Sequence, residues 1–269
     1  MFLREMKTPI NAMKEKLGIT ASIVLYNEDL DELTNTVNCF LNISLTKTLF
    51  LIDNTSDKKF KNIFKQREIK YIAVGENIGF GCGHNTILKE LENFSRYHLI
   101  LNPDVFFHQN VIPNLILELE KNKEIAMIAP KVLFPNGQHQ FSCRRYPSVK
   151  ELFTRRFPFL KPIFKTTIYN GQYREKDLSK PFYVEYLAGC FQLYKTSDFV
   201  NLKGFDERYF LYMEDVDICR KIDFLGKKKM YFPDEQIVHV LKQGSLKNIN
   251  LFFRHISSAV KYFLKWGFS

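Results

Sequence analysis

The chain has 269 residues, of which 45% are hydrophobic and 25% charged, so disorder over most of its length is excluded. This length allows one large α/β domain or two small ones. The formal net charge of +10 favours an anionic partner, such as nucleic acid, nucleotide phosphates or an anionic membrane surface, without choosing among them. The five cysteines are scattered and form no CxxC pair, which argues against a disulfide framework or a zinc site and favours a reducing cytosol.

The N-terminal residues lack the apolar segment of a signal peptide, and no stretch approaches the ~18 apolar residues that a membrane span requires. We therefore expect a cytoplasmic protein that can still rest on a membrane surface.

Apolar runs alternate with amphipathic segments along the first half of the chain. Buried strands are predicted at residues 19–26, 47–54, 69–74, 97–102 and 125–132. Helices are predicted after residue 29, from the end of a glycine-rich loop (75–85) through about residue 94, and over 110–121. This alternation indicates βαβ units and a mostly parallel central sheet flanked by helices.

Three of these strands end in polar or acidic residues, namely Tyr26-Asn27, Asp53-Asn54 and Asn102-Pro103-Asp104. In open α/β sheets, ligands bind at the carboxyl ends of the strands. Each group taken alone is explained equally well as a turn former, but three in succession favour a ligand site.

The second half of the chain is less regular. Residues 144–165 contain seven basic side chains and one acid, with Phe and Pro interleaved. They predict an inserted or mobile loop over the site, although a solvated surface loop explains the same composition. Strands are predicted at 182–189, 191–194 and 228–232, and a helix at 214–226. Residues 246–269 contain an amphipathic basic helix, which either docks on the core or lies on an anionic membrane with Trp266 in the interface.

The segment FLYMEDVDICR (210–220) places Glu214, Asp215 and Asp217 behind an aromatic run, at the start of the predicted helix. The helix dipole favours acids in a first turn, which explains one or two of them but not the aromatic run. A carboxylate here can act as a general base on a sugar hydroxyl. A carboxylate at a strand end, such as Asp104, can hold Mg²⁺ or Mn²⁺ against a nucleotide diphosphate.

The glycine-rich loop GENIGFGCGHN follows a strand and precedes a helix. Its GxGxG spacing matches neither the dinucleotide fingerprint nor the P-loop. We predict a flexible loop whose backbone approaches a ligand, and a structural hydrogen bond rather than a ligand role for His84.

The motifs ASIVLYN, LFLIDN, GENIGFGCGHN, LILNPDV, YLAGCFQLY, GFDERYFLYMEDVDICRK and PDEQIVHV occur in this order. Together they resemble the family 2 inverting glycosyltransferases with the GT-A fold, especially rhamnosyltransferase-like members that build bacterial O-antigen or capsule polysaccharide. The resemblance covers residues 19–266 and implies a GT-A domain (19–245) with a basic loop (143–180) inside it. Residues 1–18 would form an N-terminal extension and 246–269 the C-terminal basic helix.

The resemblance implies transfer of a sugar from a nucleotide diphosphate to a hydroxyl of a lipid-linked glycan. The protein would be peripheral on the cytoplasmic face of the inner membrane. L-rhamnose from dTDP-rhamnose is the implied donor sugar, with UDP-hexose or UDP-galactofuranose as the alternative.

The same resemblance implies site residues. Asp215 would be the catalytic base, and Glu214 and Asp217 would support the site and the acceptor. Asp104 and His239 would hold Mg²⁺ or Mn²⁺. The nucleotide-sugar pocket would contain Tyr26, Asn27, Asp53, Asn77, Gly79, Asn85, Asn102, Gly189 and Cys190, with Asp53 reading the pyrimidine base. Asn102 replaces the first acid of the family's DxD motif, which leaves one metal carboxylate and gives His239 more weight.

Two other classes of protein fit part of the sequence. A nucleotidylyltransferase shares the fold and the metal, but it normally carries a glycine-rich basic loop after the first strand, where this chain has NEDLDE. A nucleic-acid-binding protein fits the net charge, but the acidic segment opposes it, and we expect no nucleic-acid partner.

Overall fold

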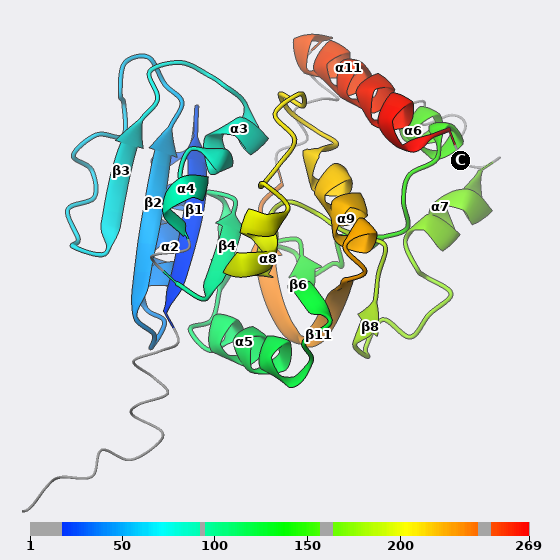
Figure 1. Cartoon of the computed structure of the whole chain (residues 1–269), viewed down its shortest axis with the longest axis horizontal. Coiled ribbons are helices and arrows are strands. Elements are labelled where there is room, and N and C mark those ends of the chain that lie inside the picture. Colours follow the sequence, from blue (N-terminus) through cyan, green and yellow to red (C-terminus); the bar gives the residue numbers. More distant parts are fainter. Residues whose placement is uncertain (1–17, 92–94, 157–163, 242–248, 269) are drawn as a thin grey trace, which may run out of the picture.

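The computed structural model describes residues 18–91, 95–156, 164–241 and 249–268. Within these residues nine strands form a central sheet, and two short strands form a separate pair (Figure 1). The sheet contains β1 (Ile19–Leu25), β2 (Lys47–Asp53), β3 (Ile69–Ala73), β4 (Tyr97–Leu101), β5 (Val105–Phe107), β6 (Ile125–Leu133), β8 (Phe182–Tyr183), β10 (Phe191–Lys195) and β11 (Lys228–His239). The separate pair is β7 (Cys143–Arg144) and β9 (Tyr186–Leu187).

The central sheet is mixed: within the described residues, four of its eight neighbouring strand pairs are parallel and four are antiparallel. The strand order is β3-β2-β1-β4-β10-β6-β11-β5, and β8 pairs with another part of β11. Strands β3, β2, β1 and β4 are parallel to one another, as are β6 and β11. The antiparallel strands are β10, β5 and β8. The predicted central sheet is therefore confirmed, but its strand pairing is mixed, and parallel pairing predominates only in the half formed by β3, β2, β1 and β4.

Helices cover both faces of this sheet. They are α2 (Leu30–Leu41), α3 (Phe80–Asn85), α4 (Leu88–Leu91), α5 (Val111–Lys121), α6 (Val149–Arg156), α7 (Lys165–Gly171), α8 (Thr196–Asn201), α9 (Glu214–Phe224) and α11 (Ile249–Trp266). One core packs the sheet against α2 and α5, and a second packs it against α4, α8 and α9. Because both faces are covered, β1, β2 and β4 are almost continuously apolar and buried, rather than alternating.

The predicted C-terminal amphipathic helix is present as α11, on the outside of α9 and near the top of Figure 1. None of the helices in the described part of the chain has the length and apolar character that crossing a membrane requires.

The basic segment predicted as an inserted or mobile loop is partly helical. It contains α6, and α7 begins at its end. Glu151, the one acid of the segment, is buried in α6 and forms an ion pair with Arg144 at 3.8 Å, which fixes the helix to β7. Residues 157–163 of this segment lie outside the described residues, as do residues 1–17 of the predicted N-terminal extension.

Two strand predictions were wrong. Residues 182–189 form two short strands in different sheets, because the Val184 N–H binds the Lys229 carbonyl while Glu185 accepts from the Tyr146 N–H. Conversely, β11 continues past Phe232 to His239. Its register with β6 shifts between Phe232 and Gln236, around Pro233, which has no N–H to donate to a ladder.

Candidate active site

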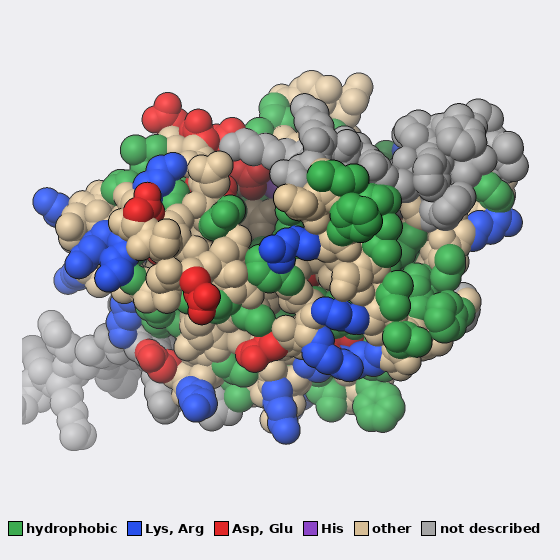
Figure 2. All heavy atoms as spheres, turned by 90° about the horizontal axis from the view of Figure 1, so that it is seen from above, with side chains coloured by type: hydrophobic (Ala, Val, Ile, Leu, Met, Phe, Trp, Pro, Cys, Tyr) green, Lys and Arg blue, Asp and Glu red, His purple; other side chains and the backbone are tan. Residues whose placement is uncertain are grey.

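The polar strand ends predicted from the sequence meet at one edge of the sheet. Strands β1, β2 and β4 are in parallel register, so their carboxyl ends point the same way. Figure 2 views the molecule from this side and shows a hollow near the middle of the face. The candidate site is built around this edge from the ends of these strands, from β11 and from the start of α9.

A cavity of about 260 Å³ lies at the ends of β1 and β2. It is lined by Tyr26, Asn27, Thr55, Ser56, Asp57 and Lys59. The Tyr26 ring is 55% exposed and offers a flat apolar surface, while the other side chains offer polar groups and one positive charge. This combination suits a nucleoside, and it contains Tyr26 and Asn27 as predicted.

Asp53 is placed differently from the prediction. It lies beside this cavity but is fully buried, and its Oδ1 accepts hydrogen bonds from Thr55 N (2.8 Å) and Thr55 Oγ1 (2.6 Å). Its Oδ2 accepts from the Tyr71 hydroxyl at 2.5 Å. Asp53 therefore shapes the cavity wall through Thr55, and Thr55 rather than Asp53 lines the cavity.

Asp104 and His239 approach each other at the centre of the site. Asp104 follows β4 and His239 ends β11, and His239 Nε2 lies 3.3 Å from Asp104 Oδ1. Asn102 Nδ2 lies 3.4 Å from the same Nε2. Burial by itself lowers the pKa of His239, but Cys190 and Asp104 outweigh it and raise the pKa to about 10.

Gln140 fixes the orientation of the His239 ring. Its Oε1 lies 3.0 Å from Nδ1 and can only accept, so Nδ1 donates and Nε2 is left to face Asp104. Gln140 Nε2 also donates to the His239 carbonyl at 2.5 Å. A partner of this kind is typical of histidines that bind metals.

The residues present fit a divalent cation. Asp104 Oδ1 is buried and accepts no hydrogen bond from the described residues, so its charge is not satisfied by the protein apart from the His239 ion pair. Within the described residues no cluster of three or more His, Cys, Asp or Glu side chains is arranged to hold a metal. The protein would supply two ligands, and Mg²⁺ or Mn²⁺ would take the remainder from phosphate and water.

The three acids of the 210–220 segment have three different environments. Glu214 is buried, and its Oε2 has no hydrogen-bond partner among the described residues. Asp217 is fully buried. Only Asp215 is partly exposed, and its Oδ2 accepts from the Gly189 N–H at 3.1 Å. Of the three, Asp215 is therefore the one placed to meet a substrate.

A strained turn sets the position of Asp215. Tyr212 and Met213, which precede α9, both have positive φ angles, of 69° and 71°. Bulky residues rarely adopt this conformation, and such strain is concentrated at functional sites. Here it turns the chain so that the first residues of α9 reach the cleft.

The Gly189-Cys190 dipeptide connects Asp215 to Asn102, whose Nδ2 lies 3.4 Å from His239 Nε2. The Gly189 N–H binds Asp215, while the Cys190 carbonyl accepts from Asn102 N at 2.9 Å. A Cβ on Gly189 would lie 3.2 Å from the Cβ of Asp215, so the absent side chain allows this approach. The predicted base and the predicted metal residues therefore belong to one site.

Asp217 is used as an anchor for α11. Its Oδ1 accepts from Lys265 Nζ (2.7 Å), Trp266 Nε1 (2.7 Å) and the Tyr209 hydroxyl (3.1 Å). The predicted contact of Asp217 with the sugar acceptor is not supported, because the buried carboxylate is bonded to Lys265, Trp266 and Tyr209. Of the two alternatives for the C-terminal helix, the one that placed Trp266 in a membrane interface does not hold for this residue, because the indole N–H is turned inward to Asp217.

The glycine-rich loop does not form a flexible cradle. Its second half is α3, whose glycines allow close packing: a Cβ on Gly83 would lie 2.7 Å from Val24, and one on Gly81 2.9 Å from Phe205. His84 is buried, and its Nδ1 lies 2.7 Å from Ser22 Oγ, which agrees with the predicted structural role.

Two predicted donor-pocket residues in this loop make internal contacts. Asn77 Oδ1 accepts from Gly79 N at 3.0 Å and shapes the entry to α3. Asn85 is bound on both sides of its amide to the Phe205 backbone, at 2.9 Å each, so it joins α3 to the turn before the acidic segment. Neither contact requires a ligand.

We expect Gly79→Ala to unfold far more easily than Gly75→Ala. Both glycines have φ near +90°, so Ala costs about 1–2 kcal/mol at either position. At Gly75 no atom lies within 4 Å of the new Cβ, whereas at Gly79 it would meet the Phe210 carbonyl oxygen at 2.1 Å. The expected loss for Gly79→Ala is about 3 kcal/mol or more. Urea unfolding of the pair measures the difference, and equal midpoints would contradict this packing.

Glu214 predicts a pH-dependent stability. Burial first, and then the neighbouring Asp215, raise the pKa of Glu214 well above its ordinary value. The folded state therefore retains a proton that the unfolded chain releases near pH 4.5, and this contribution to stability is lost as pH rises toward the folded pKa.

Replacing Glu214 with Gln removes this dependence. The free energy of unfolding of Glu214→Gln minus that of the wild type should increase with pH above about 4.5, by at most about 1.4 kcal/mol per pH unit. Urea unfolding between pH 5 and 8 tests this, with Glu124→Gln at an exposed position as the control. A constant difference over this range would contradict the proton on Glu214.

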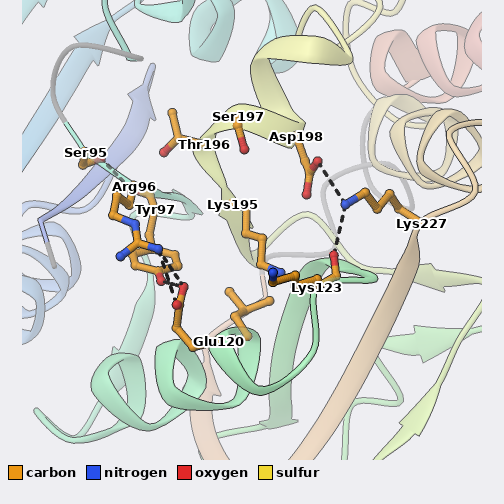
Figure 3. Close-up of a pocket in the computed structure, with 11 residues that line it drawn as sticks. Ser95, Arg96, Tyr97, Glu120, Lys123, Lys195, Thr196, Ser197, Asp198 and Lys227 are labelled. Atoms are coloured by element: carbon orange, nitrogen blue, oxygen red, sulfur yellow. Dashed lines mark hydrogen bonds and ion pairs between the residues drawn. The ribbon is translucent and has the colours of Figure 1, made fainter. Parts of the chain in front are cut away.

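A larger cavity, of about 670 Å³, lies at the opposite edge of the sheet. Figure 3 shows that four of its charged side chains form two pairs, Arg96 with Glu120 and Lys227 with Asp198. Lys195 donates to the Asn122 carbonyl at 2.9 Å. Its wall lacks every predicted site residue, so the hollow at the carboxyl ends is the better candidate.

Sequence reasoning missed Gln140, Thr55 and the Lys265–Trp266 pair. Gln140 lies in the stretch NGQHQF, which carries no known pattern. Thr55 stands two residues after Asp53, and its position next to a strand end is the one signal that could have identified it.

A nucleoside-sized cavity, an Asp–His pair and a carboxylate at the carboxyl ends of the strands agree with a glycosyltransferase of the GT-A type. The fold agrees, since the chain superposes with a TM-score of 0.63 on a crystal structure of GalNAc-T7 with UDP, GalNAc and Mn²⁺. That match has 16% sequence identity and covers 84% of this chain and 43% of GalNAc-T7. At this identity it shows the fold alone.

The family model of glycosyl transferase family 2 matches residues 20–202, more than half of the chain. The chain therefore belongs to glycosyl transferase family 2. It is 27% identical over 203 residues to the rhamnosyltransferase WbbL of Escherichia coli K12, covering 72% of this chain and 73% of WbbL. It is 26% identical over 206 residues to an N-acetylglucosaminyl-diphospho-decaprenol L-rhamnosyltransferase of Mycobacterium tuberculosis, covering 71% and 66%.

Proposed function

We propose that this glycosyltransferase moves L-rhamnose from dTDP-rhamnose to a hydroxyl of a lipid-linked glycan in bacterial surface polysaccharide synthesis, with inversion at the anomeric carbon. The single observation that carries the reaction is the position of Asp215, a partly exposed carboxylate joined through Gly189-Cys190 and Asn102 to the Asp104–His239 pair. The sugar and the acceptor are supported by the names of the two rhamnosyltransferase relatives, one of which is named for N-acetylglucosaminyl-diphospho-decaprenol.

In this reaction Asp215 removes the proton from the acceptor hydroxyl. The oxygen forms a bond to the anomeric carbon while the bond from that carbon to the diphosphate oxygen breaks, so the nucleoside diphosphate leaves with the electron pair. The hydrogen bond from the Gly189 N–H holds the carboxylate in place, and the cavity beside Tyr26 holds the nucleoside. Alignment of the two sugars supplies much of the rate.

Glu214 is unsuited to the same task. Burial and the neighbouring Asp215 raise its pKa and favour the neutral acid, which cannot accept a proton. Of these two neighbouring acids, Asp215 is therefore the one that can act as the base in the cleft.

Asp104 and His239 would hold a divalent cation, Mg²⁺ or Mn²⁺, which would offset the charge of the diphosphate. We place the enzyme at the cytoplasmic face of the membrane, as a peripheral protein, because a polyprenol-linked acceptor is confined there.

The test is a transfer assay with an N-acetylglucosaminyl-diphospho-polyprenol acceptor. The purified protein is supplied with dTDP-rhamnose, UDP-galactofuranose or UDP-glucose, and the product is analysed by mass and anomeric configuration. Transfer of rhamnose with inversion supports the proposal. Transfer from a UDP-sugar alone favours the alternative donor, and retention of configuration overturns the assigned role of Asp215.

A further inference from the structure

Helix α11 exposes a continuous apolar stripe. It consists of Ile249, Phe253, Ile256, Val260 and Leu264, which are between 44% and 72% exposed. Their spacing of three or four residues places all five on one face of the helix. Large apolar side chains gathered in this way mark an interaction surface, whereas single ones do not.

The stripe is not needed to hold α11 in place. The opposite face docks on the protein through buried Ser258, Tyr262 and Phe263. Ser258 Oγ donates to the Leu211 carbonyl at 2.9 Å, and Arg220 Nε donates to the Tyr262 hydroxyl at 3.0 Å. The helix is therefore anchored on one face and apolar on a face turned to solvent.

The positive charges of α11 favour an anionic partner for the apolar stripe. From Leu241 to the C-terminus the chain has five Lys or Arg residues and no Asp or Glu. Arg254 and Lys261 lie on the polar side of the helix, beside the stripe, whereas Lys265 is turned inward to Asp217. An apolar face flanked by cations is typical of a helix lying in the interface of an anionic bilayer. A second copy of this chain would bring two sets of like charges together, which opposes self-association.

The stripe also lies near the candidate site. The Leu211 carbonyl, the Phe210 ring and Asp217, all within the segment that carries Asp215, are held by α11 residues. Figure 1 shows α11 on the side toward which the carboxyl ends of β2 and β3 point, and Figure 2 shows hydrophobic side chains gathered on that side near the hollow. A partner surface bound to the apolar stripe of α11 would therefore lie close to the opening of the cleft.

We propose that the apolar stripe of α11 docks on an anionic lipid bilayer. The docked helix holds the opening of the catalytic cleft next to the membrane surface, and its inner face carries the catalytic segment. The docking stands on the surface of α11 and requires neither the proposed sugar nor the proposed acceptor.

The test is co-sedimentation of the full chain with vesicles of phosphatidylcholine containing about one third phosphatidylglycerol. The wild type should bind, and binding to vesicles of phosphatidylcholine alone should be much weaker. The double variant Phe253→Ser/Leu264→Ser should bind at least about tenfold less, because two large side chains no longer enter the bilayer. The variant Phe224→Ser is the matched control, since Phe224 is 86% exposed but lies on α9.

A second pair, Ile256→Ser/Val260→Ser, repeats the test on the same stripe, and circular dichroism confirms that each variant is folded. Equal binding by the wild type and both stripe variants would overturn the proposal, as would failure of the wild type to bind. So would a dimer in analytical ultracentrifugation that both stripe pairs dissociate without any vesicle binding. Nucleotide binding in solution, measured on the same samples, reports on the proposed function separately.

Discussion

Replacing Asp215 with Asn is expected to lower turnover by about 10³-fold or more while leaving nucleotide binding unchanged. Asn has the same shape, and its carbonyl oxygen can still accept from the Gly189 N–H, so the local structure is preserved. The amide cannot take a proton from the acceptor hydroxyl. The loss therefore falls on the chemical step and should appear in kcat rather than in the donor KM.

Glu214→Gln is the control for this variant, because it changes the adjacent residue by the same isosteric substitution. Glu214 is buried and favours its neutral form, so turnover should stay within about tenfold of the wild type. Two results would remove Asp215 from its role: turnover retained in Asp215→Asn, or an equal loss in both variants.

The sheet and most of its strands could be predicted because their signals are local. The runs that became β1, β2 and β4 are mainly apolar, and polar residues mark where each one ends. The resulting parallel register brings Tyr26, Asp53 and Asp104 to one edge, as expected from the rule for open α/β sheets. The error at 182–189 arose because periodicity gives no information on which partner a short strand chooses.

The different environments of the three acids could not be predicted in the same way. Glu214, Asp215 and Asp217 look alike in sequence, and their exposure depends on segments far along the chain. Asp217 is buried because Lys265 and Trp266, 48 and 49 residues later, fold back over it. Asp215 stays partly exposed because Gly189 has no side chain to cover it. The role of Gln140 could not be predicted either, because it depends on His239, which β11 places beside it.

The dependence of Asp217 on α11 links the helix to the site. The acid that resembles an acceptor residue in sequence joins α11 to the start of α9, where the strained Tyr212-Met213 turn sets the direction of Asp215. The bonds between α11 and the segment 209–217 therefore stabilise a turn that is costly on its own.

Replacing Asp104 with Asn is expected to abolish the metal-dependent part of nucleotide diphosphate binding. The variant keeps the size of the side chain but loses the one carboxylate of the Asp104–His239 pair, and an amide is a much weaker ligand for Mg²⁺ or Mn²⁺. We expect at least about 100-fold weaker Mn²⁺-dependent binding, since only two protein ligands are present. Calorimetry with dTDP, UDP and GDP, with and without Mn²⁺, measures the effect and identifies the preferred base.

Two further variants separate the metal from the nucleoside cavity. Gln140→Leu leaves both ligands in place but frees the His239 ring, so it should weaken Mn²⁺-dependent binding by about 10- to 100-fold, less than Asp104→Asn. Asp57→Asn changes the cavity beside Tyr26, so any effect should be the same with and without Mn²⁺. If Asp104→Asn weakened binding equally with and without Mn²⁺, Asp104 would belong to the nucleotide contact itself. The Asp104–His239 pair would then be a salt bridge that supports the cleft. Basic side chains, rather than a metal ion, would have to neutralise the negative charge of the diphosphate.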